Sequence, residues 1–220
     1  MNLRISYLTV FFILLAKGTI AQSYLGFHAG INSGKFSGDS PRNFIYKGLL
    51  QFNAGFDFDI KLKKDLYLAV SPNYLRSGSR LQYPYENEEE EIKEYRDSIK
   101  LKIQMLTLPI HLNIISENDK WQYIGGFELG FPVQALADNT SKEIDISDEF
   151  NSVMVSMIFG VGYRIPIAES YLAINLGYSQ GLTNLARNLE DPESYMPRIR
   201  FTSFRLTTIY MLPIGKVAKN

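Results

Sequence analysis

The chain of 220 residues has no cysteine, a single tryptophan and only two histidines. Without cysteine it can form no disulfide, no thiolate metal site and no cysteine nucleophile. Its 23 basic and 23 acidic residues cancel, and this balance argues against nucleic-acid binding, which favours a basic patch. We therefore expect no nucleic-acid partner, and a stability that does not come from disulfides.

Long apolar runs are also missing from most of the chain. After residue 21 no apolar stretch reaches the roughly 18 residues at which a membrane-spanning helix is suspected. In a bilayer every backbone polar group must find an internal partner, so a closed β-barrel is the other way to span the membrane.

The first 21 residues predict a secretory signal peptide. Arg4 supplies a positive start, residues 5–16 are apolar, and Thr19-Ile20-Ala21 resembles a small-residue cleavage site. A buried N-terminal helix is the alternative interpretation. Cleavage removes two basic residues and leaves 22–220, with 21 basic and 23 acidic residues, hence a net charge of −2. We expect this part to form one barrel domain.

The clearest structural pattern lies in residues 48–68. Apolar side chains occupy every even position from Leu50 to Leu62, and small or polar ones fill the odd positions between them. A period of two residues indicates a strand with one apolar face. After a Lys63-Lys64-Asp65 turn the apolar positions resume at Leu66. The run is long enough for the roughly 9–11 residues of a strand that crosses a bilayer, so it predicts a membrane-spanning hairpin.

The same alternation recurs along the chain and predicts an eight-stranded antiparallel up-and-down transmembrane β-barrel. The connections alternate between long polar loops and short turns, which is the layout of outer-membrane barrels with short turns and both termini in the periplasm. A change of phase in the fourth strand predicts a β-bulge near Met105–Thr107, with Pro109 close to it. The expected strands are Tyr24–Ser33, 48–62, 66–77, Ser98–Ile115, Trp121–Leu136, Ser152–Ile165, Tyr171–Thr183 and Arg198–Leu212.

Alternation alone does not say which face points inward. A soluble lipocalin-like lipid carrier would turn its apolar set to the inside. Here the polar set consists mostly of Gly, Ser, Asn and Gln, which suits the narrow bore of an eight-stranded barrel. The bulky apolar set suits lipid, and aromatic residues near strand ends suit the interfacial girdles. The expected girdle residues are Trp121, Tyr123, Tyr163, Tyr171 and Tyr210.

A few charged residues fall on the face expected to line the lumen. Charges there must pair, because burying an isolated charge is costly. We expect an ion network that plugs the bore, with Arg164 or Arg205 paired to a carboxylate; an ion or solute path is the alternative. The expected network comprises Asp57, Asp59, Lys102, Glu128, Arg164 and Arg205.

Three other features of the sequence bear on chemistry. The acidic loop Tyr83–Asp97 predicts a solvated charge run, because it has no glycine bend of the kind calcium loops use. His28 and His111 are the only bases near neutral pH, and neither has a nucleophile and carboxylate at informative spacing. We therefore expect no catalytic residues, no metal and no cofactor, with a lipid-modifying enzyme as the alternative.

Several stretches of the second half resemble the small outer-membrane barrels of Bacteroidota known as PorT-like or porin-family proteins. They are Leu106–Leu112, Gly125–Gly130, Gly160–Tyr163 and Leu176–Asn184, and the junction Ala21-Gln22 fits as well. The resemblance implies an outer-membrane barrel, and some members serve a protein-secretion system. It offers no active-site residues to carry over. Such barrels often end at an aromatic residue, whereas residues 213–220 extend past Tyr210.

Together these observations predict a monomeric outer-membrane barrel without catalytic activity, embedded in outer-membrane lipid. Its expected role is structural or interactive, with proteins of a secretion or uptake complex as candidate partners.

Overall fold

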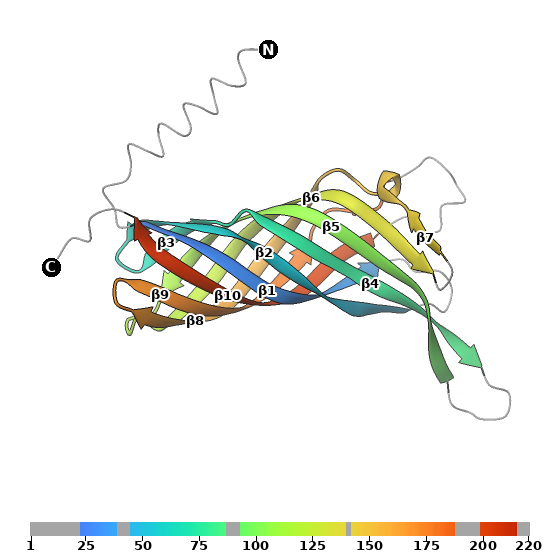
Figure 1. Cartoon of the computed structure of the whole chain (residues 1–220), viewed down its shortest axis with the longest axis horizontal. Helices are drawn as coiled ribbons and strands as arrows, with labels where there is room; N and C mark the ends of the chain where they lie inside the picture. The colour runs from blue at the N-terminus through green and yellow to red at the C-terminus, as the bar shows by residue number, and fades with distance from the viewer. Residues whose placement is uncertain (1–22, 39–44, 87–92, 140–141, 188–198, 215–220) are drawn as a thin grey trace, which may run out of the picture.

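A computed structural model describes residues 23–38, 45–86, 93–139, 142–187 and 199–214. The predicted signal peptide and the tip of the acidic loop, residues 87–92, lie outside this part of the chain. Almost everything described is strand (Figure 1). The elements are β1 Ser23–Gly38, β2 Ile45–Lys63, β3 Leu66–Val70, β4 Asn73–Glu86, β5 Lys93–Ile115, β6 Trp121–Asn139, β7 Lys142–Asp145, the short 3-10 helix η1 Ser147–Glu149, β8 Met154–Ile167, β9 Ser170–Gly181 and β10 Ile199–Ile214.

The strands close into one antiparallel ring. Its order is β1, β2, the β3–β4 pair, β5, β6, β8, β9 and β10, and β10 returns to β1. β3 and β4 act as one strand interrupted at Ser71 and Pro72, because both pair with β2 on one side and β5 on the other. β7 is a short addition beside β6. The predicted eight-stranded up-and-down barrel is confirmed, although β1, β4 and β5 run further than the predicted strands.

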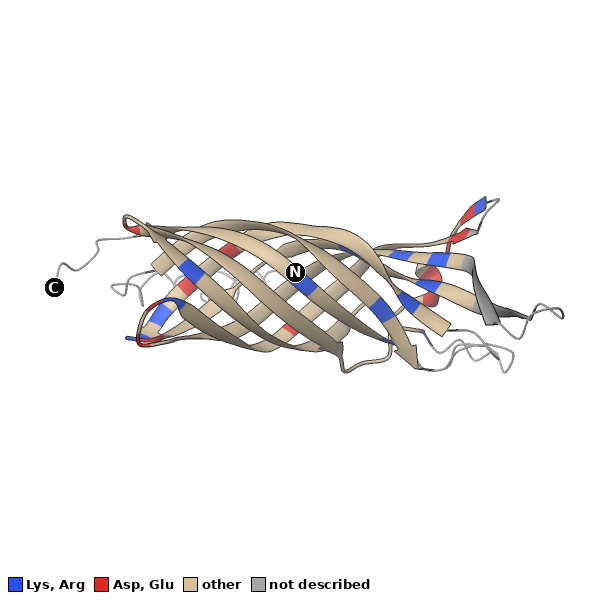
Figure 2. Ribbon diagram, turned by 90° about the horizontal axis from the view of Figure 1, so that it is seen from below, with Lys and Arg blue, Asp and Glu red and all other residues tan. Residues whose placement is uncertain are grey.

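The bulky apolar side chains of the middle of the barrel point outward, as their size predicts. Phe27 and Phe56 project from the outer wall with 57% and 61% of their surface exposed, whereas Glu128 inside is 0% exposed. Charged residues are sparse along the middle of the barrel and frequent toward its ends (Figure 2). An outward apolar band is what membrane barrels present to lipid. The soluble lipocalin-like alternative is wrong, because its bulky apolar set would lie inside.

The predicted change of phase in the fourth strand is wrong. Leu101, Met105 and Asn113 all point inward from β5, so its facing never reverses. The irregularity is on the partner strand: Gln104 pairs with Gln134 and Met105 with Pro132, which leaves one extra residue in β6. What changes along β5 is the polarity of the bore. Its inward residues Leu101, Ile103 and Met105 are apolar, whereas Thr107, His111 and Asn113 on the same face are polar.

The two ends of the barrel differ. Short turns, both termini of the described barrel and β3 gather at one end, which we call the short-turn end (Figure 1). β7 and the projecting part of the β4–β5 hairpin lie at the other end, which we call the long-loop end. No helix in the described residues is long and apolar enough to cross a membrane.

Inside the wall an apolar cluster fills the half of the bore toward the long-loop end. Phe36, Phe201 and Met105 are 0–1% exposed there. Segments outside the ring complete the cluster, because Phe150 follows η1 and Leu185 follows β9. Backbone bonds tie these segments together, from Leu185 N to the Ile199 carbonyl at 2.7 Å and from Asn151 N to the Leu185 carbonyl at 2.9 Å. The interior is therefore not small and hydrophilic throughout, as the residue pattern predicted. The carboxylates of Asp57 and Asp59 are buried in the half toward the short-turn end.

The aromatic girdle is present in part. Trp121 and Tyr163 stack edge to face on the outer wall, with ring centres 5.1 Å apart, and Tyr123 beside them is 55% exposed. Tyr210 contacts Phe27 at 5.8 Å. The prediction for Tyr171 is wrong, since its ring points into the bore and is 8% exposed.

Candidate functional site

Two of the predicted lumen charges meet in the middle of the bore. Arg205, from β10, donates two hydrogen bonds to Glu128, from β6, at 2.5 and 2.7 Å. β6 and β10 stand three places apart in the ring of eight, so this pair reaches across the bore. Ser179 adds a contact of 3.4 Å to the same carboxylate. Two parallel N–H···O bonds make the strongest geometry that an arginine and a carboxylate can form.

A second polar link crosses the bore nearer the short-turn end. Asp59 on β2 and Arg164 on β8 come from opposite strands of the ring and lie 3.8 Å apart. Tyr171 joins them: its hydroxyl accepts from Arg164 at 2.5 Å and donates to Asp59 at 3.0 Å. The Arg164 guanidinium also lies 3.9 Å from the centre of the Tyr171 ring. Gln122 accepts a further bond from Arg164 at 2.9 Å. The link thus joins side chains from β2, β6, β8 and β9.

Asp57 pairs with a histidine rather than with an arginine. His28 Nδ1 lies 2.6 Å from the Asp57 carboxylate, and His28 Nε2 lies 3.0 Å from the Asn73 side-chain oxygen. Both ring nitrogens are therefore occupied, so the imidazole has none left for a nucleophile. Asn73 also donates to the Thr107 hydroxyl at 3.2 Å. This arrangement supports a structural imidazole better than a general base, which must reach the proton that it removes.

The placement predicted for Lys102 is wrong. Its amino group lies on the outside of the barrel, 2.9 Å from Asp138 and 3.6 Å from Glu143, with 29% of the side chain exposed. The reason is the unbroken facing of β5: Lys100 and Lys102 point outward because Leu101 and Ile103 point inward. At this level the outer wall is polar and the bore apolar, the reverse of the middle of the barrel.

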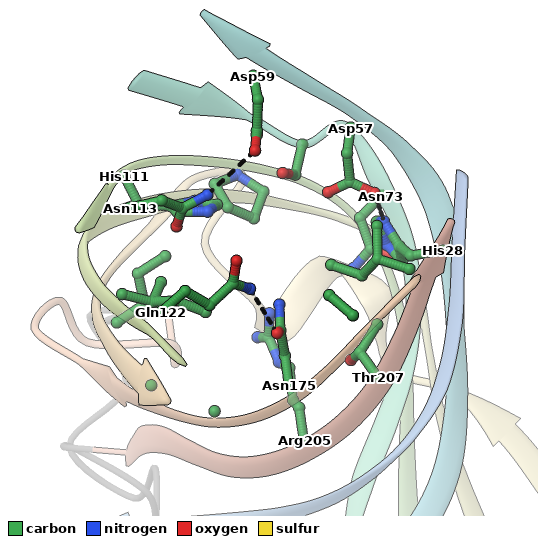
Figure 3. Close-up of a pocket in the computed structure, with 18 of the residues that line it drawn as sticks. His28, Asp57, Asp59, Asn73, His111, Asn113, Gln122, Asn175, Arg205 and Thr207 are labelled. Carbon is green, nitrogen blue, oxygen red and sulfur yellow. Dashed lines mark hydrogen bonds and ion pairs between the residues drawn. The ribbon is translucent and has the colours of Figure 1, made fainter. Parts of the chain in front are cut away.

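Between the two cross-bore links lies a cavity, which we call the lumen chamber. It has a volume of about 110 Å³. Its walls carry His28, Asp57 and Asn73 on one side and Gln122, Asn175 and Arg205 on the other (Figure 3). Gln122 donates to Asn175 at 2.6 Å.

The chamber offers hydrogen bonding rather than obvious chemistry. Among the described residues, no group of three or more histidine or acidic side chains could hold a metal ion. His111 lines the chamber, but its Nδ1 atom is buried without a partner. These features give no assembled nucleophile, base and orienting acid of the kind that triads require.

The residue pattern missed part of this site. It placed Tyr171 in the interfacial girdle and assigned no structural role to His28. The position of Tyr171 at the start of β9 looked like a girdle site, but its odd number puts it on the same face as Asn175 and Ser179, and this parity was the available signal. For His28 the parity with Asn32 was the corresponding signal. Its pairing with Asp57, one strand away, depends on the register between β1 and β2, in which Phe27 faces Phe56 and His28 faces Gly55.

Comparisons with known proteins agree with this fold. A model of the family described as outer membrane protein beta-barrel domain matches residues 20–187. A search of curated protein sequences found no significant match. Among solved structures the chain is similar to Neisserial surface protein A, with 13% identity and a TM-score of 0.50, over 86% of this chain and 96% of that chain.

Two further structures cover similar shares of the chain. Ail, the attachment invasion locus protein of Yersinia pestis, has 10% identity and a TM-score of 0.47, over 87% of this chain and 99% of that one. The outer membrane protease OmpT from Escherichia coli has 12% identity and a TM-score of 0.44, over 89% and 98%. At such identities the likeness concerns the fold alone.

Proposed function

The chain belongs to the outer membrane protein beta-barrel domain family, and from that premise we propose that it is a non-conducting, non-catalytic barrel that presents its long-loop end to a partner. The observation that carries this proposal is the closed bore. The apolar cluster fills one half, and the Glu128–Arg205 and Asp59–Arg164 links cross the other. A barrel of eight strands has an interior just wide enough for its side chains, and here those side chains meet.

The orientation follows from the layout of the strands. Short turns in the periplasm and long loops outside are the rule for barrels of this kind, so the short-turn end and both termini face the periplasm. The predicted signal peptide, residues 1–21, is the expected means of export. The long-loop end, with β7 and the extended β4–β5 hairpin, then faces the cell exterior.

Within the family, the motif stretches Leu106–Leu112 and Leu176–Asn184 support a PorT-like member. Such a member would be a monomeric accessory of a secretion or uptake complex. The absence of catalysis is supported by His28, whose two ring nitrogens are both engaged.

Conductance measurements on the purified chain in planar lipid bilayers test the closed bore. We expect no single-channel steps from the wild type. A Phe150→Ser/Leu185→Ser variant, which removes two apolar side chains from the cluster, should also show none, because the Glu128–Arg205 and Asp59–Arg164 links still cross the other half of the bore. Regular steps from the wild type would contradict the proposal.

The interaction role needs a separate measurement. Ile144, in β7, is 50% exposed at the long-loop end, and Phe127, on the lipid-facing wall, is 55% exposed. A photo-cross-linking side chain at position 144 should give discrete protein adducts in the cell envelope. The same group at position 127 should give none. Equal patterns from both positions would count against a partner at the long-loop end.

A further inference from the structure

The outer wall of the barrel carries an apolar groove beside the break between β3 and β4. The groove has a volume of about 410 Å³, larger than the cavity of about 150 Å³ that accommodates benzene. Ala54 and Pro72 are short side chains within it, while Phe56 and Leu106 beside them are 61% and 54% exposed. We call it the wall groove. One row of its residues crosses four neighbouring strands and consists of Ala54, Tyr74, Leu106 and Phe131.

Cationic side chains stand on the same strands toward the long-loop end. Arg76, on β4, lies about 7 Å along the strand from the wall groove, and its guanidinium is 5.5 Å from the centre of the Phe52 ring. Further along, Lys47, Arg80 and Lys100 pair directly across β2, β4 and β5, and all three face outward. We call these three residues the cationic row. Like charges placed opposite each other on neighbouring strands repel, and an anion shared between them offsets this repulsion.

The described strands around the cationic row add little negative charge to the outer wall. β1, β10 and residues 73–82 of β4 contain no acidic residue, and the two acidic residues of β2, Asp57 and Asp59, point inward. Asp138 faces Lys100 across β5 and β6, but its carboxylate is held by Lys102 at 2.9 Å. Basic segments of the strands gather toward the long-loop end (Figure 2). This part of the wall therefore attracts an anion.

We propose that the wall groove, Arg76 and the cationic row together bind one phosphorylated lipid of the surrounding membrane. Arginine binds phosphate through paired N–H donors, so the phosphate would lie between Arg76 and the cationic row. The acyl chain would lie in the wall groove against Phe56 and Leu106. A lipid without phosphate makes no use of the cations, and a free phosphate makes no use of the groove.

The spacing of the two parts matches one lipid monolayer. Six residues of β4 separate Tyr74 from Arg80, which is about 20 Å along the strand. Strands of membrane barrels are tilted by roughly 40°, so the two parts differ in depth by about 15 Å. Half of a hydrocarbon core of about 30 Å is the same distance. That the leaflet concerned is the outer one rests on the orientation proposed above.

Native mass spectrometry of the full mature chain in detergent micelles tests this assignment. Dioleoyl phosphatidic acid should bind with saturation at one molecule per barrel. Dioleoyl glycerol has the same chains without the phosphate, and inorganic phosphate has the charge without the chains. Both should bind at least tenfold more weakly. Equal binding of either control compound would overturn the inference, as would uptake of phosphatidic acid that does not saturate.

Charge variants locate the phosphate. Arg76→Gln/Lys100→Gln removes two cations beside the proposed phosphate and should weaken binding of phosphatidic acid at least tenfold. Lys35→Gln/Arg200→Gln is the matched control, because it removes the same charge from exposed positions of β1 and β10. This control should change binding less than twofold. Equal effects of the two variants would show that only the overall charge matters and would refute the site.

A second pair of variants locates the acyl chain. Ala54→Phe fills the wall groove and should weaken binding at least tenfold, whereas Ile174→Phe, on β9 across the ring, should leave it unchanged. Heat-modifiable gel mobility shows that each variant is folded. If Ala54→Phe does not assemble, Leu106→Ala, which removes one side of the groove, should weaken binding severalfold. Unchanged binding in the folded groove variant contradicts the proposal. Binding in detergent needs neither a closed bore nor a protein partner, so these results are separate from the tests of the proposed function.

Discussion

Replacing Glu128 by glutamine leaves the Arg205 guanidinium in the bore without its counter-charge. Glu128 is fully buried and its side-chain partner is only 12% exposed, so neither group has much access to water. Removing one member of a buried ion pair typically costs about 3–5 kcal/mol. We expect Glu128→Gln to lower the free energy of unfolding by about this amount, because the amide keeps the shape of the carboxylate but not its charge.

Urea unfolding of the barrel in lipid vesicles measures this change. Trp121 is the only tryptophan and lies on the outer wall against Tyr163, so its fluorescence reports the loss of the barrel without touching the ion pair. The exposed pair of Lys102 and Asp138 is the control. Lys102→Met should cost less than about 1 kcal/mol, as exposed pairs do.

A double variant distinguishes the loss of one charge from the loss of both charges of the pair. Glu128→Leu with Arg205→Met removes both charges and keeps most of the volume, and such replacements are often neutral or stabilising. The double variant should therefore be more stable than Glu128→Gln. The reasoning is refuted if Glu128→Gln costs no more than the Lys102 control, or if the double variant is the least stable of the three.

Two further predictions concern the outside of the barrel. Phe56→Arg places a cation on the lipid-facing wall, which costs about 2–4 kcal/mol at mid-membrane, so this variant should be missing from the outer membrane in fractionation, whereas Phe56→Leu should reach normal levels. At the long-loop end, hydrogen bonds from the Ser147 hydroxyl at 2.6 Å and backbone N–H at 2.9 Å lower the pKa of Asp145 below its ordinary 3.8. A lowered pKa adds stability that is present above the ordinary value and is lost as pH falls through the folded value. Ser147→Ala should raise the pKa of Asp145 in an NMR titration, and an unchanged pKa would show that the hydroxyl does not act on this carboxyl.

Much of the fold could be predicted because alternation is a local property. Each strand shows its two faces in its own residues, as the even positions of 50–62 do, and no knowledge of neighbouring strands is needed. The outward direction of the bulky set could also be predicted, since a narrow bore admits small residues and lipid favours large apolar ones. Strand ends were predicted less well, because the strands continue past the membrane. There the apolar residues of a strand face the bore and the polar residues face outward, the reverse of the membrane-spanning part. Lys102 was placed inside for this reason.

The amino-acid sequence by itself determined an eight-stranded barrel with an apolar outer belt, because period-two patterning and turn residues act within a few positions of one another. Only the tertiary structure decided which polar groups meet in the bore. Glu128 and Arg205 are 77 positions apart, and their contact depends on strand register and ring closure together. The same holds for the apolar cluster that Phe150 and Leu185 complete and for the lumen chamber. Each depends on where distant segments come to lie, which no single stretch of the chain encodes.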